Sequence, residues 1–239
     1  WIAAALVPTV ATGLLFNWAT DLIALVAFLG TARFFTALAG MDIGTSFGGI
    51  GSSRETMIAS LAEPAMLLVV LTVALVAGTT QLSAVAERMM TGEVGLRVSL
   101  VMAAVALIMV AVAENGRIPV DNPATHLELT MVHEAMVLEY SGRHLALIEA
   151  AQMVKLVAYL SLIACIFVPL GMATQGAGLG GGVLGVLVWG AKLAALGTAL
   201  AVFETTIAKM RVFRVPEFLG GALMLGFLGT LLLFVSRSF

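Results

Sequence analysis

The sequence predicts an all-α fold, a polytopic bundle of transmembrane helices. Of its 239 residues, 61% are hydrophobic and 11% are charged, whereas soluble proteins average about half apolar and a quarter charged. Several apolar runs also reach the roughly 20 residues that a helix needs to cross the hydrocarbon core of a bilayer. We therefore expect one transmembrane domain over residues 1–239 that is surrounded by lipid.

Seven apolar runs are expected to span the membrane, because each is long enough or nearly so and because glycine, proline or charged residues separate them. In chain order, the expected spans are 1–16, 22–40, 56–78, 97–113, 146–172, 183–203 and 217–236. Pro64 predicts a kink in the third span, since proline cannot donate the helical hydrogen bond. The chain opens with Trp1 inside an apolar run that lacks the charged start and cleavage site of a signal peptide, so we expect further sequence upstream.

Positive charges predict the orientation of these spans, since cytoplasmic loops are enriched in Lys and Arg. With seven spans, the loops 41–55, 114–144 and 204–216 lie on one side. These loops carry Arg54, Arg117, Arg143, Lys209, Arg211 and Arg214. The opposite side carries only Arg88, Arg97 and Arg237. We therefore place the first side in the cytoplasm.

Ionisable residues also occur within or at the ends of the apolar spans. They are Arg33, Glu63, Glu149, Lys155, Lys192 and Glu204. Charges at such depth are costly, and they usually face the bundle interior or a water-filled path. At 100° per residue, one helix face collects four polar residues, Glu149, Gln152, Lys155 and Tyr159. Two interpretations remain open: ion pairs that fix helix packing, and a hydrated relay for protons or ions.

The segment 114–144 is the most polar part of the chain. It places five carboxylates within 26 residues, Glu114, Asp121, Glu128, Glu134 and Glu139. Neighbouring carboxylates repel one another, so some should bind protons more tightly than they do in water and titrate near neutral pH. Pro119 and Pro123 keep the backbone out of a regular helix. A solvated loop is the alternative, but the density of acids, prolines and histidines favours a proton-handling segment.

The sequence offers no set of residues for a metal or a redox cofactor. Cys165 is the single cysteine, so the chain can form neither an internal disulfide nor an iron–sulfur site, and we expect a small buried hydrophobe. His126, His133 and His144 lack a recognised ligand spacing. The stretch 176–182 lacks the Gly-Lys-Ser/Thr ending of a phosphate-binding loop, which favours a flexible turn. A basic patch that could hold nucleic acid is also missing.

Two groups of motifs point to a known family. The first consists of Glu114-Asn-Gly-Arg-Ile-Pro-Val-Asp-Asn-Pro, Glu128-Leu and Glu139-Tyr-Ser-Gly. The second, upstream, is Gly51-Ser-Ser-Arg-Glu-Thr-Met-Ile-Ala-Ser-Leu-Ala-Glu63. Together they resemble the ND1 family of complex I, the membrane subunit that docks the peripheral arm. The region from Arg211 to Arg214 is similar to the last cytoplasmic loop of that family.

The amino-acid sequence of the polar segment resembles that of one branch of the superfamily. Complex I members usually read Asn-Arg-Ala-Pro-Phe-Asp-Leu-Pro-Glu-Ala-Glu, where this chain reads Gly-Arg-Ile-Pro-Val-Asp-Asn-Pro-Ala-Thr-His-Leu-Glu. This resembles the membrane anchors of group 4 nickel–iron hydrogenases, of the formate hydrogenlyase and hydrogenase-4 type. Such anchors lie in a prokaryotic inner membrane and have eight spans, one more than the seven expected here. In the complexes of these relatives, electrons pass from iron–sulfur clusters to protons at nickel–iron and no quinone is required, which argues against a quinone-binding role.

The resemblance implies a non-catalytic subunit of an oxidoreductase complex. Its partners would be the hydrogenase large and small subunits, an iron–sulfur subunit and an antiporter-like membrane subunit, and the nickel–iron centre and iron–sulfur clusters would lie in those partners. The expected proton relay consists of Glu63, Glu114, Asp121, Glu128, Glu134, Glu139, Glu149, Lys155, Lys192 and Glu204. Docking and charge pairing would use Arg54, Arg117, Arg143, Lys209, Arg211 and Arg214. Two alternatives stay open: the quinone-site subunit of NADH:quinone oxidoreductase, and a stand-alone ion transporter, which often shows an internal repeat that we do not find here.

Overall fold

The computed structural model describes residues 1–12, 19–92, 97–121, 131–174 and 178–238, and these ranges fold into helices joined by turns. In chain order the helices are α1 (Ile2–Leu6), α2 (Leu22–Asp42), α3 (Ser46–Ala77), α4 (Leu82–Met90), α5 (Val98–Glu114), α6 (His133–Val137), α7 (Gly142–Phe167), α8 (Gly178–Thr206), the short 3-10 helix η2 (Val212–Arg214) and α9 (Val215–Ser238). Helices α2, α3, α7, α8 and α9 are long and apolar enough to cross a membrane, and α5 is a shorter apolar helix of 17 residues. The prediction of an all-α membrane helix bundle is confirmed.

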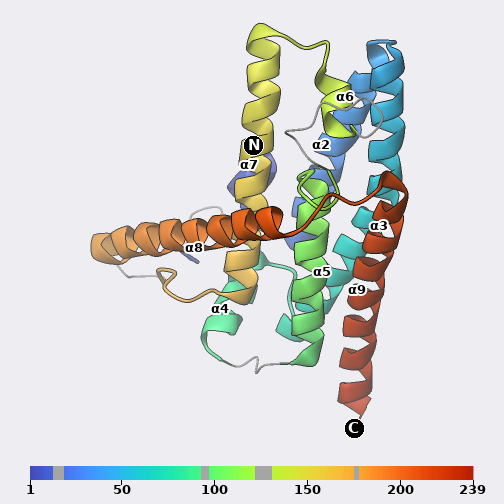
Figure 1. Ribbon diagram of the computed structural model, residues 1–239. Helices are drawn as coiled ribbons and strands as arrows, with labels where there is room; N and C mark the ends of the chain where they lie inside the picture. Colours follow the sequence, from blue (N-terminus) through green and yellow to red (C-terminus); the bar gives the residue numbers. More distant parts are fainter. Residues whose placement is uncertain (13–18, 93–96, 122–130, 175–177, 239) are drawn as a thin grey trace.

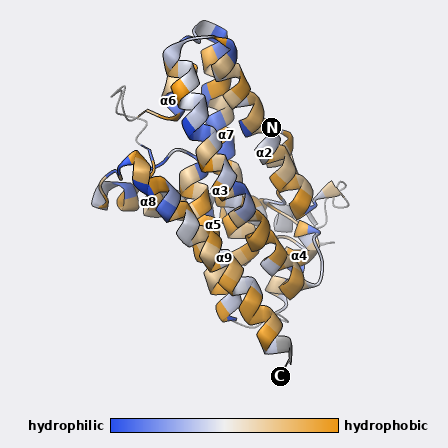
Figure 2. Ribbon diagram, turned by 90° about the vertical axis from the view of Figure 1, so that its right-hand side faces the viewer, coloured by the Kyte–Doolittle hydropathy of each residue, from blue (hydrophilic) through white to orange (hydrophobic). Residues whose placement is uncertain are grey.

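Helix α3 lies at the centre of the bundle and packs against α2, α5, α6 and α9 (Figure 1). Its 32 residues make it about 48 Å long at 1.5 Å per residue. The core between these helices is aliphatic, and Val69, Val73, Leu107 and Leu219 are almost completely buried. Figure 2 shows that α5 and α9 are mostly hydrophobic, whereas polar residues gather near α6 and the adjoining part of α7.

Two glycines allow α9 to approach the neighbouring helices closely. A Cβ atom on Gly229 would lie 3.1 Å from the carbonyl oxygen of Ser99 on α5, and one on Gly226 would lie 3.1 Å from Cβ of Leu68 on α3. Small residues at such contacts let helix backbones come together, which is how helices associate in lipid, where burial from water contributes little.

The expected loop 41–55 is largely helical, because α3 begins at Ser46 rather than near residue 56. The Thr45 side chain caps the first turn. The glycines that suggest a loop serve packing instead: a Cβ atom on Gly51 would lie 2.9 Å from Cβ of Ala135 on α6. Tertiary packing therefore overrides the low helix propensity of glycine.

The expected first span, 1–16, is not a continuous helix. Helix α1 ends at Leu6, and residues 7–12 are not helical. Pro8 lacks the N–H that a helix would need there, and the following backbone bonds to the segment after α7, with Thr12 N donating to the carbonyl of Ala173 at 3.1 Å. Residues 13–16 lie outside the described ranges, which contain six of the seven expected spans as helices.

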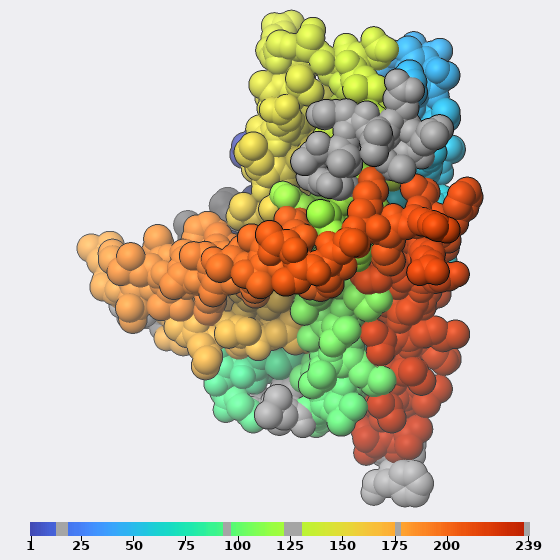
Figure 3. All heavy atoms as spheres, in the orientation of Figure 1, coloured from blue at the N-terminus to red at the C-terminus, as the bar shows by residue number. Residues whose placement is uncertain are grey.

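Helix α8 lies across the bundle rather than along it, and its outer surface crosses the face shown in Figure 3. It contains the expected span 183–203, and no residue of its most apolar stretch is buried. Residues 178–182 form its first turn, so the predicted flexible turn over 176–182 is wrong for these residues. Residues 175–177 lie outside the described ranges.

Candidate functional site

The end of α5 brings a carboxylate into the bundle interior. Gly116 follows the helix with φ of 57°, a left-handed conformation that favours glycine. The side-chain amide of Asn115 donates a hydrogen bond of 2.7 Å to the carbonyl of Ala111, which also accepts from the backbone N–H of Asn115. These two residues end α5 just after Glu114, whose side chain is 6% exposed.

Four charged side chains from four helices, three of them buried and one partly exposed, meet at the end of α5. Arg33 of α2 lies between two carboxylates: its Nε is 3.2 Å from Oε1 of Glu55 on α3, and its Nη2 forms an ion pair with Oε2 of Glu114. Lys155 of α7 reaches the same carboxylate, with its Nζ 3.2 Å from Oε2, and it also donates to the backbone carbonyl of Glu114. We call Arg33, Glu55, Glu114 and Lys155 the charge cluster.

The charge cluster has two cations and two carboxylates, so its formal charge is zero. Burying an isolated ion is costly, and a buried pair offsets this cost only when each charge has close partners. The cluster meets this condition by alternating in sign from α3 through α2 and α5 to α7. Nη1 of Arg33 is an exception within the described residues, since it is buried without a hydrogen-bond partner. It could therefore donate to a water molecule.

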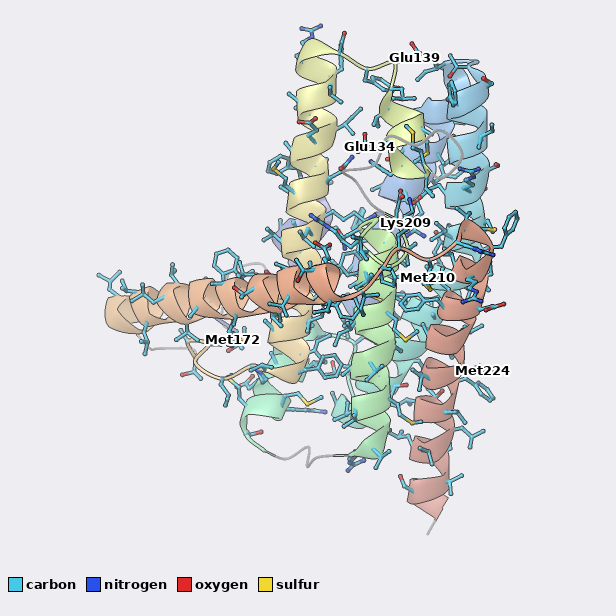
Figure 4. All side chains as sticks on the ribbon, viewed as in Figure 1. Glu134, Glu139, Met172, Lys209, Met210 and Met224 are labelled. Atoms are coloured by element: carbon cyan, nitrogen blue, oxygen red, sulfur yellow. The ribbon has the colours of Figure 1, made fainter. Side chains whose placement is uncertain are left out.

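The turn after α5 links the cluster to the loop between α8 and α9. Nζ of Lys209 lies 2.7 Å from Oδ1 of Asp121, and the backbone N–H of Met210 donates to the carbonyl of Pro119 at 2.8 Å. Nη1 of Arg117 lies 3.7 Å from Oε1 of Glu204 at the end of α8. Figure 4 shows Lys209 and Met210 between the ends of α5 and α9. The predicted relay residues Asp121 and Glu204 therefore each meet a predicted pairing cation.

The short helix α6 is tied to three surrounding elements. The backbone N–H of Val132 donates to Oδ2 of Asp121 at 3.3 Å, and Nη1 of Arg54 donates to the carbonyl of Met131 at 2.7 Å. The imidazole of His133 contacts the side-chain amide of Gln152 on α7. Burial lowers the pKa of His133 below its usual 6.5, and Glu55 and Asp121 only partly oppose this effect. His133 is therefore neutral at pH 7.

A cavity of about 640 Å³ opens beside the charge cluster. Its wall is mainly apolar, and its polar lining includes the cluster together with Asp121, His133 and Gln152. Glu134 and Glu149 also line it, and Figure 4 shows Glu134 on α6, on the side of α7. Such a cavity can hold water next to buried carboxylates, which is what proton exchange requires.

Other predicted residues make no contact with the charge cluster among the described ion pairs. Glu139, Glu149, Arg143, Arg211 and Arg214 are exposed, and Glu139 lies in the loop between α6 and α7. Glu63 is also exposed, with Oε1 3.4 Å from where a Cβ of Gly30 would lie. Lys192 of α8 is half-buried, within electrostatic reach of Cys165 on α7. Glu128 and His126 lie outside the described residues. His144 is exposed, and the described residues contain no group of three potential metal ligands.

Glu55 is not among the residues that the sequence predicts for the site, and the role of Arg33 stays open there. A helical signal for Glu55 exists: Ser52, Glu55, Ile58 and Ala62 fall at spacings of three and four, and all four are buried. The glycines before Glu55 favour a loop, which hides this periodicity. Of the four polar residues predicted to share one face of α7, Gln152 and Lys155 contact interior partners and Tyr159 is buried, whereas Glu149 is exposed.

Comparison with known proteins defines the family. A model of the NADH dehydrogenase family matches residues 1–235. The chain belongs to this family, of the complex I ND1 type. It is 33% identical over 217 residues to "Formate hydrogenlyase subunit 4" of Escherichia coli (strain K12), covering 90% of this chain and 69% of that protein. It is 36% identical over 155 residues to "Hydrogenase-4 component C" of the same organism, covering 65% of this chain and 48% of that protein.

One chain of a solved membrane complex has a similar fold. The membrane-bound sulfane sulfur reductase, described as an archaeal respiratory membrane complex, contains a chain that matches 89% of this one with a TM-score of 0.75. Sequence identity is 19%, and the match covers 69% of that chain. The protein is thus a multi-pass, complex-I-like membrane subunit, as its sequence predicts.

Proposed function

We propose that this chain is the membrane-anchor and proton-coupling subunit of a membrane-bound nickel–iron hydrogenase of the formate hydrogenlyase type. The charge cluster supports the coupling role most directly. Charges within a membrane protein are costly, and where they occur they usually mark a path for ions or protons. The hydrogenase branch is supported by the similarity to the two Escherichia coli proteins, which are named as components of such complexes.

The cluster can respond to a single proton. Protonation of Glu114 removes the negative charge shared by Arg33 and Lys155, and the cluster then carries a net positive charge. The ion pairs of Asp121 with Lys209 and of Arg117 with Glu204 extend this response toward α8.

The polar segment 114–144 would form the docking surface for the soluble partners. Arg143 of α7 and the pair Arg211 and Arg214 before α9 are exposed and could bind acidic residues of a partner. We assign this end to the cytoplasm and the chain to a prokaryotic inner membrane. The hydrogenase large and small subunits and an iron–sulfur subunit would dock there, and they would supply the nickel–iron and iron–sulfur chemistry. The relay would continue through Lys155, Lys192 and Glu204 toward an antiporter-like membrane subunit.

The first test is the metal content of the intact complex, purified gently through a tag on this chain. We expect about one nickel per complex, the content of one nickel–iron site, and hydrogen evolution from a reduced dye. Flavin and quinone reduction without nickel would instead indicate the quinone-site subunit of NADH:quinone oxidoreductase. If the chain purified alone and moved ions in liposomes, it would be a stand-alone transporter.

A further inference from the structure

A second cavity lies at the opposite end of α5 from the charge cluster. It has a volume of about 640 Å³ and lies where the end of α3, the start of α5 and the end of α9 meet. Its lining residues are Val76, Arg97, Val98, Ser99, Leu232 and Ser236. The site combines an apolar wall with one cation and two hydroxyl groups, and none of these residues belongs to the relay.

Two polar side chains of this cavity, those of Arg97 and Ser99, have no partner among the described residues. Arg97 is exposed and forms no ion pair among the described residues. Ser99 is 5% exposed, yet its hydroxyl makes no hydrogen bond in the part of the chain that the structure describes. The hydroxyl of Ser236 donates a hydrogen bond of 3.0 Å to the carbonyl of Leu233. The Ser99 side chain lines the cavity, so its hydroxyl can donate to a ligand there.

The start of α5 adds to the attraction for an anion. Arg97 is its N-cap residue, and no side chain caps the first turn. The free N–H groups of a first turn and the helix dipole both favour negative charge. The guanidinium, the Ser99 hydroxyl and the helix start therefore act on one acceptor, and phosphate offers the charge and the several oxygen atoms that such a set can bind.

We propose that this cavity binds a phospholipid, with its phosphate at Arg97 and Ser99 and an acyl chain against Val76 and Leu232. The apolar wall distinguishes a lipid from free phosphate, since an inorganic ion would make no use of it. The position at the end of three membrane helices is also where headgroups lie. Such a lipid would hold α3, α5 and α9 together at this end, independently of the proposed hydrogenase role.

Native mass spectrometry of the complex, purified in mild detergent through a tag on this chain, tests the proposal. We expect one retained phospholipid on the released subunit. Arg97→Gln should lower its occupancy by roughly tenfold, as the loss of one charge-assisted hydrogen bond implies. Arg97→Lys should keep part of it, and Ser99→Ala should lower it by about threefold. The control Ser53→Ala removes an exposed hydroxyl that bonds to the carbonyl of Ile50 in its own helix, and it should change nothing.

Two results would overturn the proposal. One is equal lipid occupancy in Arg97→Gln and the unaltered complex. The other is retention of inorganic phosphate alone, added as a competitor, with no lipid on the subunit. Arg97 is exposed and makes no ion pair within the described chain, so Arg97→Gln should fold, and unchanged thermal unfolding of the complex checks this.

Discussion

Replacing Glu114 with glutamine should destabilise the subunit in a way that a second substitution corrects. The variant keeps the shape of the side chain but leaves Arg33 and Lys155 with Glu55 as the sole carboxylate of the cluster. Breaking a buried ion pair by removing one partner costs about 3–5 kcal/mol. Glu114 is 6% exposed and has two cationic partners, so we expect a loss of unfolding free energy in this range.

The second substitution tests whether charge balance is the cause. Lys155→Met alone leaves a net negative charge, and the loss should be smaller because the Lys155 side chain is 25% exposed. The double variant restores a neutral cluster, the pair of Arg33 and Glu55. Its loss should fall short of the sum of the two single losses by about 1–3 kcal/mol, the range for residues that share a network.

Reversible unfolding in mixed detergent micelles measures these free energies. Glu149→Gln is the matched control, since Glu149 is an exposed carboxylate on the same helix as Lys155 and its loss should stay within about 0.5 kcal/mol. Additive effects in the double variant would refute the reasoning, as would a loss for Glu114→Gln no larger than that of the control.

Two further predictions concern α6. Gly51→Ala should destabilise the subunit, because the new methyl group would lie 2.9 Å from Cβ of Ala135. The control Gly49→Ala on the same helix meets no atom within 4 Å and should be neutral or stabilising. Thermal unfolding of the two variants compares them. The second prediction follows from the lowered pKa of His133. Below pH 6.5 the unfolded chain binds a proton that the folded chain resists, so stability is fully present above pH 6.5 and declines as the pH falls. His133→Gln should remove this part of the pH dependence, and an unchanged slope between pH 7 and pH 5.5 would contradict the assignment.

The apolar spans could be predicted well because membrane length sets a strong requirement on composition. Helices α2, α5 and α9 match the predicted ranges closely, whereas α7 (Gly142–Phe167) is shifted toward the N-terminus of the predicted span 146–172. The start of α3 could not be predicted, since its glycines favour a loop unless the contact of Gly51 with α6 is known. The direction of α8 was equally hidden, because hydropathy gives the length of a helix and not its tilt.

The site could be predicted in part. Lys155 and Glu114 stand out as charges among apolar residues, and the structure places them in contact. The position of their shared partner Arg33 could not be predicted, since a single sequence does not show which helices are neighbours. Exposed acids such as Glu139 and Glu149 have the same sequence signal as buried ones. The density of carboxylates along the chain therefore indicates the region of the site rather than its members.

The most direct test of the central claim is the number of protons moved per hydrogen molecule in proteoliposomes that contain the whole complex. Hydrogen evolution from a reduced dye and the pH inside the vesicles are recorded together. If the charge cluster couples the two, Glu114→Gln evolves hydrogen while proton movement falls by at least about tenfold, in line with the loss of an essential proton carrier. The control Glu87→Gln removes an exposed carboxylate on α4 and behaves as the unaltered complex. Unchanged proton movement per hydrogen in Glu114→Gln would show that protons do not pass through the cluster.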